Sequence, residues 1–351
     1  MRGALVLLFA LIFSLLLTAC DAAPTSSPEP LPSPPPPASS PTPGRLAVPT
    51  AVPTPQAQIP FGVPERPILF ALPPAQDGIV SEPVQQVLLH LSHLTALTIL
   101  PYVPTSYHET VDGLTQGLFH LAWVSPLAYL LAHQQGQADI ALTSIVLGRE
   151  RRASQFLVNR ALVQNRTFTL YYDPLTAANL ADSTTALAQF AGARPCWPDP
   201  YSPTGYIVPL GLLHQNNIQT KPGAFLQGHT TVVKALYQDV EGLLCQFGAT
   251  VADERIFLAT ELPDVAQRVA IVWMSDPIVP FDGIAYAAAL PDELRARLTA
   301  AFLSMAQTEE GLSALRQAFQ IDGLKPVDDT FYWPLRAAVD QADLSLDTLI
   351  R

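Results

Sequence analysis

Apolar runs of strand length alternate with helical patterns from residue 67 onward, and this alternation constrains the fold more than any other feature. Buried strands are indicated by three runs: "PILFAL" (67–72), "LTILPYV" (97–103) and "HLAWVS" (120–125). Helical periodicity occupies the segments 82–97, 106–118 and 126–135. The pattern predicts an α/β fold in which a largely parallel sheet is covered by helices. In such sheets, ligands bind at the carboxyl ends of strands, beside helix N-termini.

The same alternation returns in the middle of the chain. Helices are predicted at 183–192, 203–216 and 230–238, and strands at 194–199, 242–249 and 268–275. After residue 275 the chain is predicted to be mostly helical, notably over 291–307 and 309–319. Two α/β units with a helical tail predict two lobes, the first interrupted by the second. We expect the first lobe to hold residues 61–165 and 272–351, and the second to hold 166–271.

The N-terminus has the features of an export signal. Arg2 precedes an apolar run over residues 4–17, which is short for a membrane span. The run ends in "LTAC" (17–20), which resembles the lipobox of bacterial lipoproteins, whose cysteine is acylated and becomes the new N-terminus. We therefore expect residues 1–20 to be a lipoprotein signal peptide ending at Cys20. The protein would be extracytoplasmic and lipid-anchored to the cell membrane; an uncleaved anchor helix is the alternative.

A proline-rich segment follows the predicted lipidation site. Residues 21–60 hold 14 of the chain's 35 prolines, separated by Ser, Thr and Ala. A segment with so few large apolar side chains cannot bury enough surface to offset the entropy of ordering. We expect a disordered, extended linker between the membrane and the folded part of the chain.

The charge balance limits the possible partners. The formal net charge is -11 and the isoelectric point is near 5.0, which argues against a nucleic-acid partner. Any anion site must therefore depend on local dipoles instead of a global positive field. His90 and His93 lie on a predicted amphipathic helix without metal-ligand spacing. We expect neither a metal nor a cofactor.

The remaining cysteines form a possible disulfide. With Cys20 assigned to the lipid, Cys196 and Cys245 remain, and an oxidising compartment favours pairing of an even remainder. Two buried free thiols are equally compatible with the sequence, since sequence does not give the distance between them.

The segment "CWPDPYSPTGYIVPLGLL" (196–213) places hydroxyl residues and a glycine at the start of a predicted helix. Ser202, Thr204 and Gly205 suit a helix N-terminus, and Pro203 suits the first helical position, so capping is one interpretation. Free backbone N–H groups, hydroxyls and the positive end of the helix dipole also form an anion site, which is the second interpretation.

Several segments together resemble a known family. They occur in the order and at about the spacing of the phosphate/phosphite/phosphonate-binding proteins of ABC transporters: "YHETVDGLTQGLFHLAWVSPLAYLLA", "CWPDPYSPTGYIVPLGLL", "GHTTVVKALY", "CQFGATVADER" and "VAIVWMSDPIVPFD". The resemblance covers residues 67–335. It implies a two-lobed type 2 periplasmic-binding-protein fold, with a mainly parallel sheet flanked by helices in each lobe and the ligand in the cleft. It also implies a non-enzymatic solute-binding protein that delivers an oxyanion or organophosphonate to an ABC permease.

The resemblance also implies site residues. Tyr107 matches a tyrosine that packs against the ligand head group, and His229 matches a histidine that donates to it. Ser202 and Thr204 match two of three hydroxyl residues that grip the oxyanion, whereas Pro203 replaces the third. Asp253 and Asp282 fall near the acidic site positions. A further pocket-lining aromatic would be Tyr171 or Tyr172, and another register places Arg152 there.

These residue types suit binding of a tetrahedral oxyanion. The N–H groups of Thr204 and Gly205, the two hydroxyls and a His229 N–H would donate to its oxygens. A carboxylate such as Asp253 or Asp282 would accept the proton of a monoprotonated phosphonate, or an amino group of the ligand, and would repel fully ionised sulfate.

Two other functions fit parts of the sequence. Ser202, His229 and Asp253 would supply the residue types of a hydrolase triad, although Ser202 lacks a G-x-S-x-G elbow. A ligand-sensing lipoprotein that signals to a receptor would use the same two-lobed clamp, so the sequence does not separate it from a transport protein.

Overall fold

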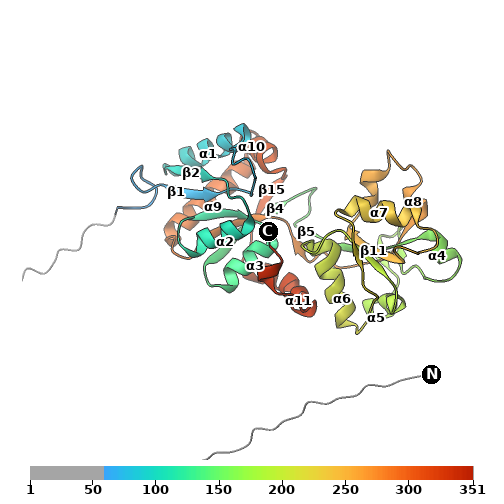
Figure 1. Ribbon diagram of the computed structural model, residues 1–351. Helices are drawn as coiled ribbons and strands as arrows, with labels where there is room; N and C mark the ends of the chain where they lie inside the picture. Colours follow the sequence, from blue (N-terminus) through green and yellow to red (C-terminus); the bar gives the residue numbers. More distant parts are fainter. Residues whose placement is uncertain (1–58, 351) are drawn as a thin grey trace, which may run out of the picture. The chain divides into compact units, whose positions relative to one another are not determined.

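The computed structural model describes residues 59–350 (Figure 1). The predicted signal peptide with Cys20, and the predicted linker up to residue 58, lie outside the described residues. Within the described part, no helix combines the length and apolar character needed to cross a membrane.

The first sheet has six strands in the order β15-β4-β14-β3-β1-β2. Its strands are β1 (Ile68–Ala71), β2 (Ile99–Tyr102), β3 (Leu121–Val124), β4 (Ala138–Ile145), β14 (Gly283–Ala287) and β15 (Gly323–Pro326). β1 runs parallel to β2 and β3, as the sequence predicts. β14 is antiparallel to both β3 and β4, and β15 is antiparallel to β4. β14 and β15 lie in the part of the chain predicted to be mostly helical, so that prediction is incomplete.

Helices cover both faces of this sheet (Figure 1). One face packs against α1 (Glu82–Thr95), α9 (Asp292–Gln307) and α10 (Glu309–Phe319). The other face packs against α2 (Tyr107–Thr115), α3 (Pro126–Gln134) and α11 (Trp333–Gln341). The apolar stripe of each helix, for example Val84, Val87, Leu88 and Leu91 on α1, supplies the buried side chains.

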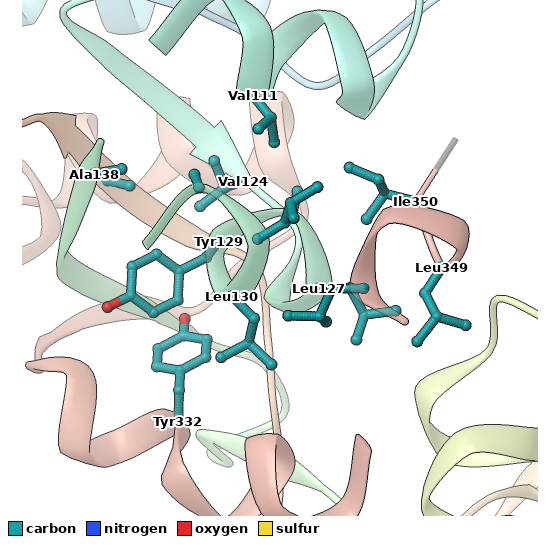
Figure 2. Packing of buried hydrophobic residues seen from close by; sticks show 14 of the residues in the cluster. Val111, Val124, Leu127, Tyr129, Leu130, Ala138, Tyr332, Leu349 and Ile350 are labelled. Atoms are coloured by element: carbon teal, nitrogen blue, oxygen red, sulfur yellow. The ribbon is translucent and has the colours of Figure 1, made fainter. Parts of the chain in front are cut away.

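The core between the sheet and α2, α3 and α11 is closed by the C-terminal residues (Figure 2). Tyr129 and Tyr332 are fully buried, with ring centroids 4.5 Å apart in an edge-to-face arrangement. Leu349 and Ile350 pack into the same cluster near Leu127. The end of the chain is therefore part of the hydrophobic core.

The second sheet has five strands in the order β10-β9-β11-β6-β12. They are β6 (Ser154–Asn159), β9 (Pro195–Trp197), β10 (Ala224–Phe225), β11 (Phe247–Val251) and β12 (Val269–Met274). β9 is parallel to β10 and β11, whereas β6 is antiparallel to β11 and β12. Antiparallel strands thus extend both sheets beyond their parallel parts.

Short helices cover the second sheet. One core contains side chains of α4 (Arg160–Gln164), α5 (Ser183–Leu187), η1 (Ala188–Phe190) and α6 (Val208–Gln215). The other contains side chains of α7 (His229–Gln238), η3 (Glu254–Leu258) and α8 (Val265–Arg268). A hairpin of β7 (Tyr172–Asp173) and β8 (Ala178–Asn179) lies outside the main sheet.

The strand predicted at 242–249 begins later, at Phe247. The Asp239 carboxylate accepts the backbone N–H groups of Leu243, Leu244 and Cys245 at 2.7–2.9 Å. Because these groups bond to a side chain, they cannot pair with a neighbouring strand, and the segment forms a loop.

The chain passes between the two sheets through a pair of short strands, β5 (Arg151–Arg152) and β13 (Val279–Pro280). They are antiparallel, with Arg152 opposite Val279 and Arg151 opposite Pro280. The expected lobe boundaries at 165/166 and 271/272 differ from this crossing. They would leave β6 in the first lobe and divide β12, whereas β6 pairs with β11 and β12 in the second sheet.

Helix α6, which packs on the second sheet, contacts α11, which covers the first sheet. A Cβ atom built on Gly211 would lie 2.5 Å from the Ala338 carbonyl oxygen, so only glycine permits this approach. His214 Nδ1 lies 3.2 Å from the Gln341 carbonyl oxygen. The two units are therefore joined by a helix contact as well as by β5 and β13.

Cys196 and Cys245 form a disulfide, with Cα atoms 5.4 Å apart and a sequence separation of 49 residues. Cys196 lies in β9, and Cys245 lies in the loop before β11. The bond therefore ties β9 to the loop that leads into β11, the neighbouring strand of the second sheet.

We predict that the Cys196→Ala/Cys245→Ala double variant loses about 2–4 kcal/mol of unfolding free energy, because the bond restricts a long loop in the unfolded chain. Urea unfolding with and without a reducing agent measures this loss. Wild-type protein should become as unstable as the variant when it is reduced. An oxidised wild type no more stable than the variant would contradict the prediction.

Candidate functional site

Ser202 and Thr204, the hydroxyl residues expected to bind an oxyanion, lie at the start of η2 (Pro203–Ile207). This π-helical segment continues into α6. The Ser202 hydroxyl accepts the Gly205 N–H at 3.0 Å and so caps the segment. The Ser202 carbonyl accepts the N–H groups of both Tyr206 and Ile207, at 3.0 and 3.1 Å. The capping interpretation is thus correct for Ser202.

Thr204 remains as a source of unused donors. Within residues 59–350 neither its N–H nor its hydroxyl forms a hydrogen bond, although its exposed fraction is only 4%. Pro203 has no N–H, so the Thr204 N–H is the first donor at the positive end of the helix. A Cβ atom at Gly205 would lie 2.1 Å from Pro198 Cγ and 2.8 Å from His229 Cε1, which explains the glycine.

His229 is the first residue of α7, and its ring is fixed from both sides. The Val251 N–H donates to His229 Nδ1 at 3.0 Å, so in the neutral ring Nε2 carries the proton. His229 Nε2 lies 3.1 Å from Ser202 Oγ and is therefore the donor in that contact. Because Ser202 Oγ already accepts two hydrogen bonds, its own hydrogen is available to a further acceptor.

This geometry changes two expected roles. His229 Nε2–H and Gly205 N–H were both expected to donate to the ligand, yet both donate to Ser202 Oγ. Their effect on a ligand passes through the Ser202 hydroxyl. At this helix start, the donors without an acceptor in residues 59–350 are the Ser202 O–H and the N–H and O–H of Thr204.

The His229 ring is neutral at physiological pH. Burial lowers the pKa of His229 to about 4; Asp199 opposes this effect and Arg152 adds to it. A neutral ring is also required for Nδ1 to accept the Val251 N–H.

A second group of side chains consists of Tyr107, Arg152 and Asp282. Tyr107 is the first residue of α2, follows the N-cap Ser106, and packs against the core of the first sheet. Burial and the neighbouring Asp282 carboxylate raise the pKa of Tyr107, so its hydroxyl is protonated. Burial also raises the pKa of Asp282, against the influence of Arg152 and Trp123.

Arg152 connects the two groups. It interacts electrostatically with Asp282 and Tyr107, and it also lowers the pKa of His229. The charge of Arg152 thus acts on His229 of the second sheet and on Tyr107 and Asp282 beside the first. Arg152 is the residue that one register of the resemblance placed in the site, whereas Tyr171 packs in the core of the second sheet and Tyr172 belongs to the β7–β8 hairpin.

Asp253 is occupied by other partners. Arg255 Nη2 donates to Asp253 Oδ2 at 2.7 Å and Arg255 Nε donates to Oδ1 at 3.0 Å, while Gln155 Nε2 approaches Oδ1 at 3.3 Å. Burial raises the pKa of Asp253, but the bonds from Arg255 and Gln155 outweigh it and hold the pKa low. Asp253 follows Val251, the residue that fixes His229, so its carboxylate supports the loop beside the site.

Across residues 59–350, no three His, Cys, Asp or Glu side chains are grouped so that they could hold a metal ion.

The fold matches that of periplasmic binding proteins of known structure. A phosphonate-transporter binding protein from Pseudomonas aeruginosa matches with a TM-score of 0.50 and 17% identity, covering 79% of this chain and 88% of that one. PhnD1 from Prochlorococcus marinus, solved with methylphosphonate, matches with a TM-score of 0.52 and 14% identity over 79% and 98%. A Xanthomonas citri protein bound to chloride ion matches with a TM-score of 0.58 and 16% identity over 79% and 97%.

The family follows from the sequence match. Residues 70–332 match the family described as ABC transporter, phosphonate, periplasmic substrate-binding protein. The chain belongs to this family. No curated protein matches the sequence.

The neutral His229 ring predicts a pH dependence of stability. The pKa of an unfolded histidine is about 6.5, so between this value and about 4 the unfolded chain binds more protons. Stability from this residue is therefore complete above pH 6.5 and is lost as the pH falls toward 4, by about 3 kcal/mol in total.

Urea unfolding at pH 7 and at pH 4.5 tests this dependence. His229→Gln, which cannot titrate, should lose much less stability on acidification than wild type. His93→Gln, on the exposed side of α1, serves as the control and should behave as wild type. Identical acid sensitivity of wild type and His229→Gln would contradict the prediction.

Proposed function

We propose that this protein binds a phosphonate-, phosphite- or phosphate-like oxyanion and delivers it to an ABC permease. The observation that carries the proposal is the Ser202 hydroxyl, which accepts bonds from both His229 Nε2 and Gly205 N–H and so has its hydrogen free for a ligand. The unused donors of Thr204 lie two residues further along the chain. Together they form a set of donors at a helix N-terminus, which favours an anion.

Compared with the family pattern, this site lacks one hydroxyl and one backbone N–H, because Pro203 replaces the hydroxyl residue usual in the family. A hydrogen bond to a charged group contributes about 1.5–3 kcal/mol, so affinity must depend on the few donors that remain. Tyr107, whose raised pKa keeps its hydroxyl protonated, supplies a further donor from the side of the first sheet.

Asp282 gives the site a criterion for selecting ligands. A carboxylate beside an anion is unfavourable unless one of the two carries a proton. A fraction of a phosphonate or phosphate carries an ionisable proton near neutral pH, since the second pKa of a phosphate monoester is about 6, and a neighbouring carboxylate favours this protonated form; sulfate has no proton to share. We infer that Asp282 and the ligand share one proton, which excludes sulfate.

The hydrolase alternative is disfavoured by the direction of the hydrogen bonds. In a catalytic triad the carboxylate receives the Nδ1 proton, so that Nε2 is free to take the serine proton. Here Nδ1 accepts the Val251 N–H, so Nε2 already carries a proton and cannot act as the base for Ser202. Asp253 is bound to Arg255 instead of His229. These contacts support a binding protein without enzymatic activity.

We further propose that the two sheets with their helices form two lobes that close on the ligand. The donors at Ser202 and Thr204 belong to the second lobe, and Tyr107 and Asp282 belong to the first. A ligand that contacts both sides favours the closed form by its additional affinity for that form. Anchoring through a lipid on Cys20 would keep the protein at the membrane that holds the permease.

Methylphosphonate, the ligand of the Prochlorococcus neighbour, is the first probe. Purified protein, unfolded and refolded to remove bound solute, should bind it in a calorimetric titration. Thr204→Val and Ser202→Ala should each weaken binding by about 10-fold or more, the equivalent of one charge-assisted hydrogen bond.

The matched control is Ser125→Ala. Ser125 caps α3 by accepting the Ala128 N–H at 3.3 Å, which is the same role that Ser202 has in η2. Its loss should lower stability by about 1 kcal/mol without changing affinity. If Ser202→Ala affects only stability, as Ser125→Ala does, Ser202 is a cap and the proposed site is wrong.

Asp282→Asn tests the proton-sharing role. The variant should bind sulfate, and its affinity for methylphosphonate should no longer fall as the pH rises above the second pKa of the ligand. Asp182→Asn, at the exposed cap of α5, is the control because asparagine also caps helices. Continued rejection of sulfate by Asp282→Asn would disprove the role of Asp282 in selection.

A further inference from the structure

Arg152 lies where the chain crosses between the sheets, and most of its donors have no partner among residues 59–350. Its guanidinium carbon is 4.8 Å from the centroid of the Phe281 ring, and its Nη2 is 3.4 Å from the Pro280 carbonyl oxygen, at the limit of a hydrogen bond. Its Nε is buried without a hydrogen-bond partner in residues 59–350. A buried cation with unused donors is costly unless another group completes its contacts.

The adjacent Arg151 has different surroundings. Its Nη2 donates to the Phe331 carbonyl oxygen at 2.7 Å, and its guanidinium carbon lies 3.8 Å from the centroid of the Phe331 ring. Its Nε is also buried and unpartnered within residues 59–350, but the groups that act on it electrostatically are Glu150 and Tyr332 instead of Tyr107 and Asp282. Successive residues of a strand point to opposite faces, which explains why two neighbouring arginines differ.

The positive charge of Arg152 acts on both halves of the proposed site. It interacts with Asp282 and Tyr107 on one side and with His229, the partner of Ser202, on the other. Asp282 does not come close enough to form an ion pair with it. The guanidinium and the carboxylate are therefore near one another, but each keeps hydrogen-bonding capacity for a third group.

We propose that Arg152 binds the ligand oxyanion directly through its unused donors and offsets the negative charge of Asp282. This inference rests on the proposed function and specifies its ligand class. The ligand is a phosphorus oxyanion that presents adjacent oxygens to a guanidinium and one ionisable proton to a carboxylate. A carboxylate alone would repel such an anion, and a guanidinium alone would not distinguish it from sulfate.

Calorimetric titration of methylphosphonate into four proteins tests the proposal. Arg152→Gln should bind about 10- to 100-fold more weakly than wild type, as expected for loss of a charge-assisted contact. Arg152→Lys keeps the charge without the planar fork and should fall between them. Arg151→Gln, the matched control on the same strand, should stay within about 2-fold of wild type.

A double variant tests the compensation between the two charges. In Arg152→Gln/Asp282→Asn the carboxylate that repels the anion is also gone, so methylphosphonate affinity should recover by about 5-fold or more over Arg152→Gln alone. Independent, additive effects of the two substitutions would overturn the compensation.

Folding of each variant is checked by its thermal unfolding without ligand. If Arg152→Gln does not fold, Arg152→Met replaces it, because methionine keeps an apolar stem against Phe281. Wild-type affinity in either variant would overturn the role of Arg152 and leave the proposed function intact. A wild type that binds neither methylphosphonate, phosphite nor phosphate would instead overturn the proposed function, and this inference with it.

Discussion

The hydrogen bond from the Val251 N–H to His229 Nδ1 is the contact on which the chemistry of the site depends. It selects the ring tautomer, and the tautomer makes Nε2 a donor to Ser202 Oγ. With the Gly205 N–H as a second donor, the serine oxygen has no role left except to donate its own hydrogen. A single backbone group at the end of β11 thus makes His229 a hydrogen-bond donor to Ser202 instead of a base that could take its proton.

Much of the fold could be predicted from local patterns. The strands at 68–71, 99–102 and 121–124 and the helices between them follow from apolar periodicity and caps such as Ser106 and Ser125. β14 and β15 were missed because their pairing is long-range: β14 lies between β3 and β4, which precede it by more than a hundred residues. The lobe boundary was misplaced for the same reason, since only the pairing of β6 with β11 and β12 assigns it to the second sheet.

For the candidate site, too, local sequence identified some of the residues, whereas the contacts between distant residues could not be predicted. The sequence shows the segment 202–205, with its hydroxyl residues and glycine, as the start of a helix. The family resemblance then identified Tyr107, His229 and Asp282 as further site candidates. Sequence could not show that Asp253 is neutralised by Arg255, or that His229 acts through Ser202, because both depend on side-chain orientation. From the sequence, Arg152 was a candidate in only one of the alternative alignments with the family. No local sequence pattern marks an arginine whose donors are unused.

The contact between α6 and α11 has a consequence for how the molecule moves. At Gly211 the backbones of the two helices approach closely, because a Cβ atom there would lie 2.5 Å from the Ala338 carbonyl oxygen. Ile207, Val208 and Leu335 belong to one buried cluster at this contact, so separating the two helices would expose apolar side chains to water. The contact therefore resists separation of the two helices, and the lobe closure proposed above has to preserve it or repack it. Thr204 lies in η2, which continues into α6, so the proposed donors and this contact belong to one continuous helical segment.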